Sequence, residues 1–314
     1  MTHRSVPGTL ASTGSFVTGL LILTSICAFA ANSILCRLAL AEGKIDAFTF
    51  TSVRLLSGAV VLTLVLFAKS RRPLIALDPF ATCALIVYAL AFSVSYLGLH
   101  AGAGALLLFG AVQITMLSVS IYRGERLSKQ AWLGFALAIT GLLAYLLPGS
   151  TSAPAFAVGA MLLAGCAWGM YSLRGAQGQN PVAATAANFL AAAPITVALA
   201  FSLGDRWHVS TEGLLWAVLS GAVTSGLGYV LWYYVVKRIP AFTAATVQLA
   251  VPITAALGGV GILGEPLTAR LIFASITVLG GIALVVQGRQ TTVRATADKR
   301  SADLQEQWVH GAGI

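Results

Sequence analysis

Charged residues are scarce in this chain. Asp, Glu, Lys and Arg make up 9% of its 314 residues, whereas apolar residues make up 58%. Soluble domains carry roughly 25% charged residues, so this chain has too little polar surface to cover a water-soluble protein of its size. We therefore expect the bilayer to be the solvent for most of the chain. The net charge of +9 does not indicate nucleic-acid binding, because the basic residues lie in short clusters between apolar runs.

Acidic residues are absent from the interior of the apolar runs. All seven acids outside the C-terminal tail lie near run ends: Glu42, Asp46, Asp78, Glu125, Asp205, Glu212 and Glu265. Proton-coupled carriers commonly use membrane-embedded acids. Coupling here would therefore need an interfacial carboxylate or the substrate itself, and facilitated diffusion is an open alternative.

Groupings of catalytic or metal-binding residues are also missing. The four histidines lie in tails or loops, and the four cysteines show neither a CxxC motif nor metal-ligand spacing. Paired carboxylates, a Ser–His arrangement and a P-loop are not seen. We therefore expect no enzyme, no ATP-driven pump, no metal site and no cofactor.

Ten long apolar runs divide the chain. A membrane-spanning helix needs about 20 apolar residues, and the runs that meet this length are 16–39, 46–68, 79–99, 101–121, 129–147, 155–174, 182–204, 211–235, 240–262 and 268–287. Eight of the ten prolines fall at or outside the ends of these runs, as expected for connections and first helical turns. Pro194 and Pro252 lie inside the seventh and ninth runs, where we expect them to kink or break the helix.

The distribution of Lys and Arg predicts the orientation. With the N-terminus in the cytoplasm, inner segments carry fourteen Lys and Arg and outer ends carry four, as the positive-inside rule requires. Residues 1–15 are then a cytoplasmic lead and residues 288–314 a polar cytoplasmic tail. The predicted fold class is an all-α polytopic membrane protein.

One box, Gly-Glu-x-Leu-Ser/Thr, occurs twice. GERLS starts at Gly124 and GEPLT at Gly264, 140 residues later, and each precedes the last apolar run of its half. Because each half has an odd number of spans, we expect two inverted five-helix repeats, 16–147 and 155–287, with the substrate site between them. We interpret each box as a structural turn, in which glycine permits the reversal and Ser128 or Thr268 caps the following helix.

These boxes, with the opening ANSILCRLALAEGKIDAFTFTSVRLLSGAVVL and its weaker echo AWGMYSLRGAQGQNPVAA, resemble the EamA-type half-domains of the drug/metabolite transporter superfamily. The resemblance implies a ten-helix carrier with cytoplasmic termini that moves small metabolites, often amino acids or drug-like solutes, and often outward. We expect an exporter of the bacterial inner membrane that works by alternating access. The alternatives are a nucleotide-sugar or drug-type permease, and a non-transporting scaffold or channel. The expected partners are a small-molecule substrate and the lipid bilayer. GxxxG at 165–169 allows close helix packing, either with a second copy in a homo-oligomer or with a helix of the same chain.

Arg54 is the most costly residue in the sequence. It lies within the second run, where a buried arginine is unfavourable unless it is paired or faces water. It can anchor a substrate carboxylate, or it can form a structural pair with an acid such as Asp46. Three further polar residues, Asn32, Gln113 and Gln248, can either bond across helices or line a cavity.

Aromatic residues complete the set of candidates. Trp168 and Tyr171 in the sixth run, and Tyr229 and Trp232 in the eighth, have the spacing of one helix face, and Tyr96 in the third run is similar. An interfacial aromatic belt and the wall of a translocation cavity are both consistent with these positions. The candidate substrate-binding residues are thus Arg54, Asn32, Gln113, Gln248, Trp168, Tyr171, Tyr96, Tyr229 and Trp232.

Overall fold

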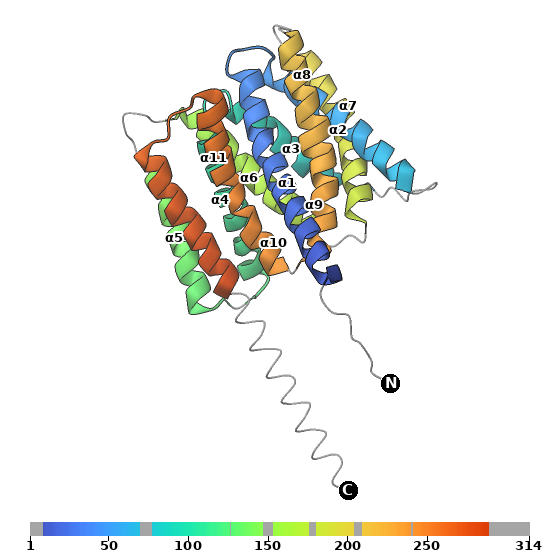
Figure 1. The fold of residues 1–314 in the computed structure, drawn as a ribbon. Coiled ribbons are helices and arrows are strands. Elements are labelled where there is room, and N and C mark those ends of the chain that lie inside the picture. The colour runs from blue at the N-terminus through green and yellow to red at the C-terminus, as the bar shows by residue number, and fades with distance from the viewer. Residues whose placement is uncertain are drawn as a thin grey trace, which may run out of the picture.

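The computed structural model describes residues 9–69, 77–125, 127–146, 153–175, 180–203, 209–239 and 241–288, and every structural statement below concerns these residues. The first half contains α1 (Thr9–Leu40), α2 (Ala47–Lys69), α3 (Pro79–Ser95), α4 (Ala101–Tyr122) and α5 (Lys129–Leu146). The second half contains α6 (Ala155–Gly175), α7 (Pro181–Leu203), α8 (Thr211–Leu219), the π-helix η1 (Ser220–Leu227), α9 (Gly228–Val236), α10 (Ala241–Gln248), α11 (Ala250–Leu263) and a last helix, Ala269–Gly288. Figure 1 shows these elements as one helical bundle.

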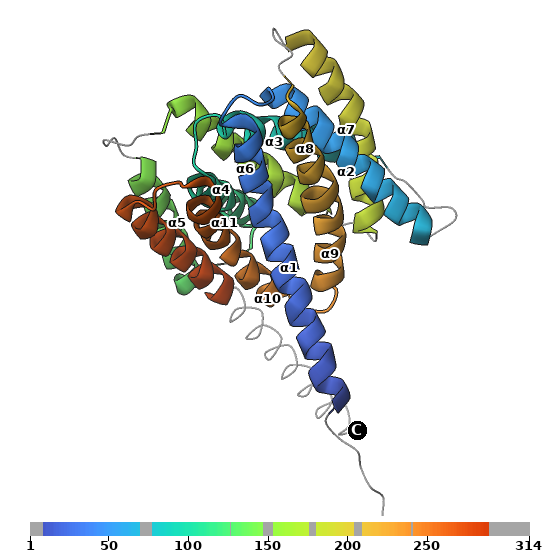
Figure 2. The same ribbon diagram turned by 45° about the horizontal axis from the view of Figure 1, so that its top comes forward.

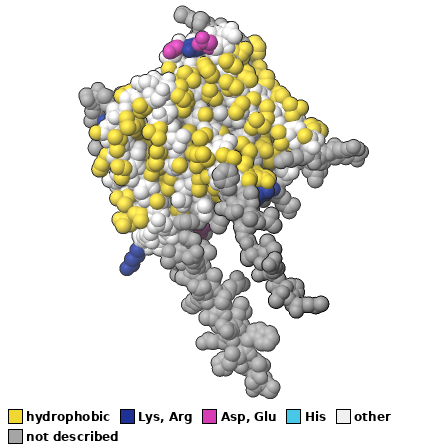
Figure 3. All heavy atoms as spheres, in the orientation of Figure 1, with side chains coloured by type: hydrophobic (Ala, Val, Ile, Leu, Met, Phe, Trp, Pro, Cys, Tyr) yellow, Lys and Arg dark blue, Asp and Glu magenta, His cyan; other side chains and the backbone are white. Residues whose placement is uncertain are grey.

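The bundle is a polytopic membrane protein. Nine described helices are long and apolar enough to cross a bilayer, and α3 is a shorter apolar helix of 17 residues. Each corresponds to one of the ten apolar runs, which confirms the predicted fold class. Many large apolar side chains are exposed on its sides, and Figure 3 shows them covering the middle of one face while charged groups lie toward its ends. A bilayer accommodates such a surface.

Three local features differ from or refine the expectations. The first helix begins at Thr9, so the lead is shorter than residues 1–15; residues 1–8 and 289–314 lie outside the described part of the chain. Near Pro252 the ninth span is divided into α10 and α11, as predicted, but α7 runs through Pro194 as one helix. The eighth span contains the unpredicted π-helix η1, whose sequence SGAVTSGL consists mostly of small residues.

The two halves pack so that the third helix of each half contacts the first helix of the other half. α3 packs against α6, and α1 packs against α8, η1 and α9, which form the corresponding pair in the other half. Likewise α4 contacts α6 while α11 contacts α1, and α2 packs against its own counterpart, α7. Figures 1 and 2 show that α1 starts and the last helix ends at the same end of the bundle. An even number of spans requires this arrangement.

The two boxes lie at opposite ends of the bundle. Glu265 accepts a hydrogen bond from the backbone N of Ala101, the first residue of α4, whereas Glu125 follows the last turn of α4. At 1.5 Å per residue, the 22 residues of α4 separate these ends by about 33 Å. The repeated motif therefore occurs once at each end, as an inverted duplication requires.

Candidate functional site

A cavity of about 1250 Å³ lies between the two halves. Its lining comes from α1, α3 and α4 of the first half and from α6, α7, η1, α9, α10 and the last helix of the second. Small-molecule sites commonly have volumes of about 300–1,000 Å³, so the cavity can hold a metabolite with space for water. This cavity is therefore the candidate site for binding a small molecule.

Seven of the nine candidate residues line this cavity: Asn32, Gln113, Trp168, Tyr171, Tyr229, Trp232 and Gln248. Arg54 and Tyr96 are absent from the lining. Tyr96 is fully buried at the C-terminal end of α3, where the ring of Phe92 packs edge-on against it and its backbone O accepts from Arg37. Its phenol is thus enclosed by protein rather than by the cavity.

The aromatic candidates form a continuous wall. The ring of Trp168 stacks on Tyr171, with centroids 5.1 Å apart, and on Tyr229, with centroids 5.4 Å apart. Its third neighbour is Tyr88 of α3, at 4.7 Å. Tyr171 and Tyr229 are buried, which favours a cavity wall over the alternative of an interfacial belt. Such a wall offers flat apolar faces to an apolar or cationic part of a solute.

Arg54 lies directly behind this wall. Its side chain is buried, its Nε donates to Ser225 Oγ and its Nη2 to Tyr88 Oη, each at 3.2 Å. Its guanidinium also lies 4.9 Å from the centroid of the Phe92 ring. Since Tyr88, Ser225 and Phe92 all line the cavity, the charge of Arg54 acts through one layer of side chains.

The structural pair between Arg54 and Asp46, one of the two alternatives for this arginine, does not form. Asp46 instead accepts hydrogen bonds from the backbone N atoms of Phe48 and Thr49, both at 2.9 Å, and so caps α2. Among the described residues, Nη1 of Arg54 has no hydrogen-bond partner. Among the described residues Arg54 is thus a buried cation held by hydroxyl groups and aromatic rings, without a contacting carboxylate.

The amide of Asn32 combines both roles that the sequence left open. Its Oδ1 accepts from Ser220 Oγ at 2.7 Å and from Thr224 Oγ1 at 3.2 Å, both in η1, so it joins α1 to the π-helix. Asn32 and Thr224 also line the cavity. The π-helix therefore places two hydroxyl groups, those of Thr224 and Ser225, at the cavity wall, and the run SGAVTSGL was the available sequence signal for it.

A second polar group in the cavity lining joins α6, α7 and α9. Thr185 Oγ1 is 2.8 Å from Tyr233 Oη and accepts from Tyr171 Oη at 3.4 Å. The Nδ2 atom of Asn188 donates to the same Tyr171 oxygen at 3.5 Å. Thr185 and Asn188 were not among the sequence candidates, although the position of Asn188 inside an apolar run was the same signal that selected Asn32.

The cavity extends to one end of the bundle. Its lining reaches Asp78 before α3, Arg174 in the last turn of α6 and Lys237 after α9. This is the end that the Lys and Arg distribution assigns to the cytoplasm. Arg174 Nε donates to Asp78 Oδ2 at 2.6 Å, and this bond holds the pKa of the Asp78 carboxyl below its usual value.

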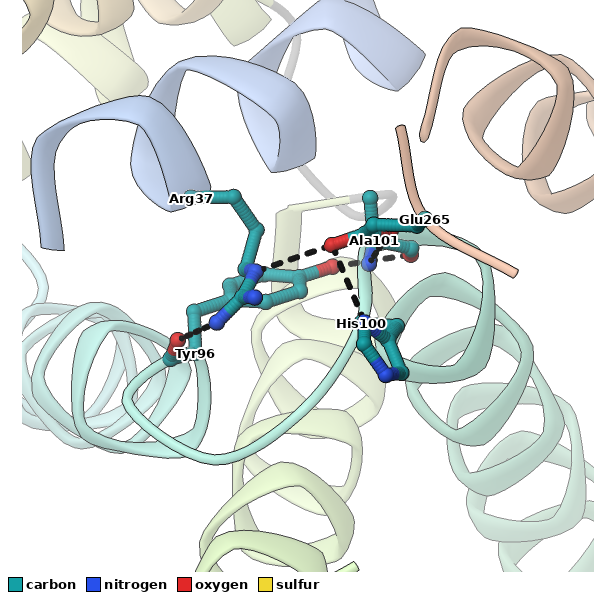
Figure 4. A network of polar contacts seen from close by, with 5 residues as sticks. All are labelled: Arg37, Tyr96, His100, Ala101 and Glu265. Carbon is teal, nitrogen blue, oxygen red and sulfur yellow. Dashed lines mark hydrogen bonds and ion pairs between the residues drawn. The ribbon is translucent and has the colours of Figure 1, made fainter. Parts of the chain in front are cut away.

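The other end is closed by the polar network of Figure 4. Glu265 Oε1 is 3.0 Å from Arg37 Nε and 3.3 Å from His100 Nδ1, while its Oε2 accepts from Ala101 N at 2.7 Å. Arg37 also donates to the backbone O of Tyr96 at 2.9 Å. The network ties α1, α3 and α4 to the segment between α11 and the last helix, and none of its residues lines the cavity.

The interpretation of the two boxes is confirmed in part. Gly124 and Gly264 have φ angles of 84° and 65°, and Ser128 and Thr268 accept from the backbone N atoms three residues later at 3.1 and 3.2 Å. A purely local role is wrong for Glu265, which is buried and bonds to α4. Its partners are 164 and 228 residues away in the chain, so no local pattern could reveal them.

Three comparisons place the chain among known proteins. The model of the EamA-like transporter family matches residues 155–287. An uncharacterised protein of Pseudomonas aeruginosa is 48% identical over 271 residues, covering 86% of this chain and 94% of the relative. The threonine/homoserine exporter RhtA of Escherichia coli K12 is 32% identical over 197 residues, covering 60% of this chain and 63% of the exporter.

A crystal structure shares the fold, with a TM-score of 0.63 and 19% identity over 86% of this chain and 97% of that one. Because the sequence identity is this low, the match shows a shared architecture only. The family model, the long similarity to the Pseudomonas protein and the ten-span bundle agree with one another. The chain is a membrane transporter that belongs to the EamA-like transporter family.

Proposed function

We propose that this transporter exports small amphiphilic metabolites, such as amino acids or drug-like solutes, across the bacterial inner membrane by alternating access. The observation that carries the proposal is a cavity shared by both halves that reaches one end of the bundle, while the Glu265 network closes the other. In this proposal both termini are cytoplasmic, so the structure corresponds to a state open to the inside.

The cavity wall supports a substrate with two different parts. The stacked rings of Tyr171, Trp168 and Tyr229 favour contact with an apolar or aromatic body. Tyr88 and Ser225, both bonded to Arg54, present hydroxyl groups in a positive potential. These hydroxyl groups suit a substrate carboxylate. The one acid in the described lining is Asp78, which lies at the mouth of the cavity.

The similarity to RhtA favours amino acids and outward movement, because that relative is named as an exporter of threonine and homoserine. A nucleotide sugar is the second candidate. The cavity is large enough for it, but Arg174 and Lys237 lie at its mouth and only Arg54 lies behind its aromatic wall, so the interior offers less charge than a diphosphate requires.

Flux through purified protein in liposomes tests the proposal. The panel contains labelled amino acids, amphiphilic drugs and nucleotide sugars, each with and without a pH gradient. We expect saturable counterflow of at least one zwitterionic or carboxylated amphiphile, and weaker flux for Trp168→Ala. Saturable flux without a gradient would exclude obligatory proton coupling, flux of nucleotide sugars alone would select the permease alternative, and absence of any saturable flux would favour a scaffold.

A further inference from the structure

A cluster of uncharged polar side chains lies in the cavity lining, on other helices than the Tyr88 and Ser225 hydroxyl groups that are bonded to Arg54. This polar cluster consists of four residues of α6, α7 and α9: Tyr171, Thr185, Asn188 and Tyr233. The first three of these residues are buried, with exposed fractions of 5%, 2% and 4%. The described hydrogen bonds of the cluster join only hydroxyl and amide groups. The cluster is therefore a polar but uncharged part of the cavity wall.

The polar cluster has more donors than its own hydrogen bonds use. Tyr171 Oη donates its proton to Thr185 Oγ1 at 3.4 Å. Thr185 Oγ1 and Tyr233 Oη, 2.8 Å apart, share one hydrogen bond, so one of their two protons is left over whichever atom donates. Asn188 Nδ2 carries two protons and donates one of them to Tyr171 Oη. Within the described contacts, the cluster thus keeps one hydroxyl proton and one amide proton for a group in the cavity.

The polar cluster lies nearer the mouth of the cavity than the hydroxyl groups at Arg54. The bond between Arg174 and Asp78 marks the level of the mouth. Tyr171 precedes Arg174 by three residues on α6, whereas Tyr88 follows Asp78 by ten residues on α3, which correspond to depths of about 5 Å and about 15 Å. The ring centroids of Tyr171 and Tyr88 lie 5.1 Å and 4.7 Å from that of Trp168. An extended solute that covers Trp168 can therefore reach both levels.

We propose that the polar cluster is a second subsite, which binds a hydroxyl or amide group of the solute. The preferred solute then has its carboxylate at Tyr88 and Ser225, an apolar body against Trp168, and a neutral polar group at the other end of that body. The inference rests on the proposed function and narrows its substrate class to elongated carboxylates with a neutral polar end.

A neutral group suits the polar cluster better than a charged one. A hydroxyl or amide group can accept the two remaining protons and can donate to the hydroxyl oxygens of the cluster. A carboxylate is more stable beside Tyr88 and Ser225, next to the positive charge of Arg54. An ammonium group would meet no anionic partner in the described contacts of the cluster, so its burial there would be costly. The two subsites therefore orient the solute with its carboxylate deep and its neutral end toward the mouth.

Competition for transport in liposomes tests the second subsite with two pairs of amino acids. Tyrosine and phenylalanine differ by a hydroxyl group at the far end of an apolar ring, whereas serine and alanine differ by a hydroxyl group close to the carboxylate. Each amino acid is added unlabelled against the labelled flux of a panel solute that is transported. One hydrogen bond to the cluster should make tyrosine inhibit at about fivefold lower concentration than phenylalanine. Serine is too short to extend past the Trp168 ring, so serine and alanine should inhibit alike.

A triple variant removes the hydroxyl groups of the cluster and keeps the aromatic rings of the wall. It combines Tyr171→Phe, Thr185→Val and Tyr233→Phe, and it should lose the preference for tyrosine over phenylalanine. Thr196→Val is the matched control, because Thr196 is a buried threonine of the same helix α7 that lies outside the cavity lining and bonds within its own helix. This control should keep the fivefold preference. Size-exclusion chromatography and yield show whether each variant is folded.

The ratio of the two inhibitory concentrations separates a subsite from a structural role. If the cluster only joined its helices, the triple variant would lose folded protein and flux while the ratio stayed unchanged, and the subsite would be overturned. If the triple variant does not fold, the wild-type comparison still decides, since inhibition by phenylalanine equal to or stronger than that by tyrosine would also overturn it. A preference for serine over alanine as large as that for tyrosine would refute the placement of the subsite near the mouth. Absence of saturable flux for every panel solute would instead overturn the proposed function, and this inference with it.

Discussion

The replacement Glu265→Gln tests the closed end of the bundle most directly. The change keeps the size and one carbonyl acceptor of the side chain, but it removes the charge that Arg37, His100 and the amide of Ala101 share. The side chain of Glu265 is only 7% exposed and that of Arg37 15%. The lost interaction is therefore weakly screened by water.

The expected magnitude follows from these contacts. Hydrogen bonds to charged groups contribute about 1.5–3 kcal/mol each, and breaking a fully buried pair costs about 3–5 kcal/mol. Because Arg37 retains some contact with water and glutamine preserves an acceptor, we expect a cost of about 2–3 kcal/mol for the closed end. At 1.4 kcal/mol per factor of ten, this shifts the population toward the outward-open state by roughly 30- to 150-fold.

Labelling from the outer face with a membrane-impermeant maleimide measures this shift, in protein whose four native cysteines are replaced and whose cavity-lining Leu108 is changed to Cys. Glu42→Gln is the control, because it also neutralises an acid at the same end, but the Glu42 side chain is 73% exposed. An exposed pair contributes less than about 1 kcal/mol, so this control should change labelling by less than about fivefold. If folded Glu265→Gln protein is labelled no faster than the Glu42→Gln control, the network does not hold this end closed.

Three further outcomes are expected. Arg54→Lys should lower transport about tenfold while folded protein is retained, because lysine lacks the forked guanidinium that reaches both Tyr88 and Ser225. An equal loss of folded protein and of transport would indicate a structural role. Trp168→Ala should raise the half-saturation concentration for aromatic solutes about fivefold and Trp168→Phe much less, and unchanged values would place the substrate elsewhere. The bond from Arg174 lowers the pKa of Asp78, so the stability that this pair contributes is complete above the ordinary carboxyl pKa of 3.8 and is lost as the pH falls through the lowered pKa. The melting temperatures of wild type and Asp78→Asn should therefore converge at that low pH in thermal-shift assays. A difference that stays constant with pH would contradict this pair.

The sequence by itself determined the membrane architecture. The bilayer requires each span to satisfy its own backbone and to reach a fixed length, so apolar runs, prolines and basic clusters are sufficient to locate the helices. The turns at Gly124 and Gly264 were equally local, because positive φ and a Ser or Thr cap depend on neighbouring residues only.

Only the tertiary structure decided which residues meet. Transmembrane helices that are apolar on every side give little amphipathic signal, so the sequence could not show that Trp168 and Tyr229 stack in one wall or that Arg54 lies behind it. The role of Glu265 was hidden for a similar reason, since its partners come from α1 and α4 of the other half. Packing between distant segments, rather than local pattern, buries Glu265 between the two halves.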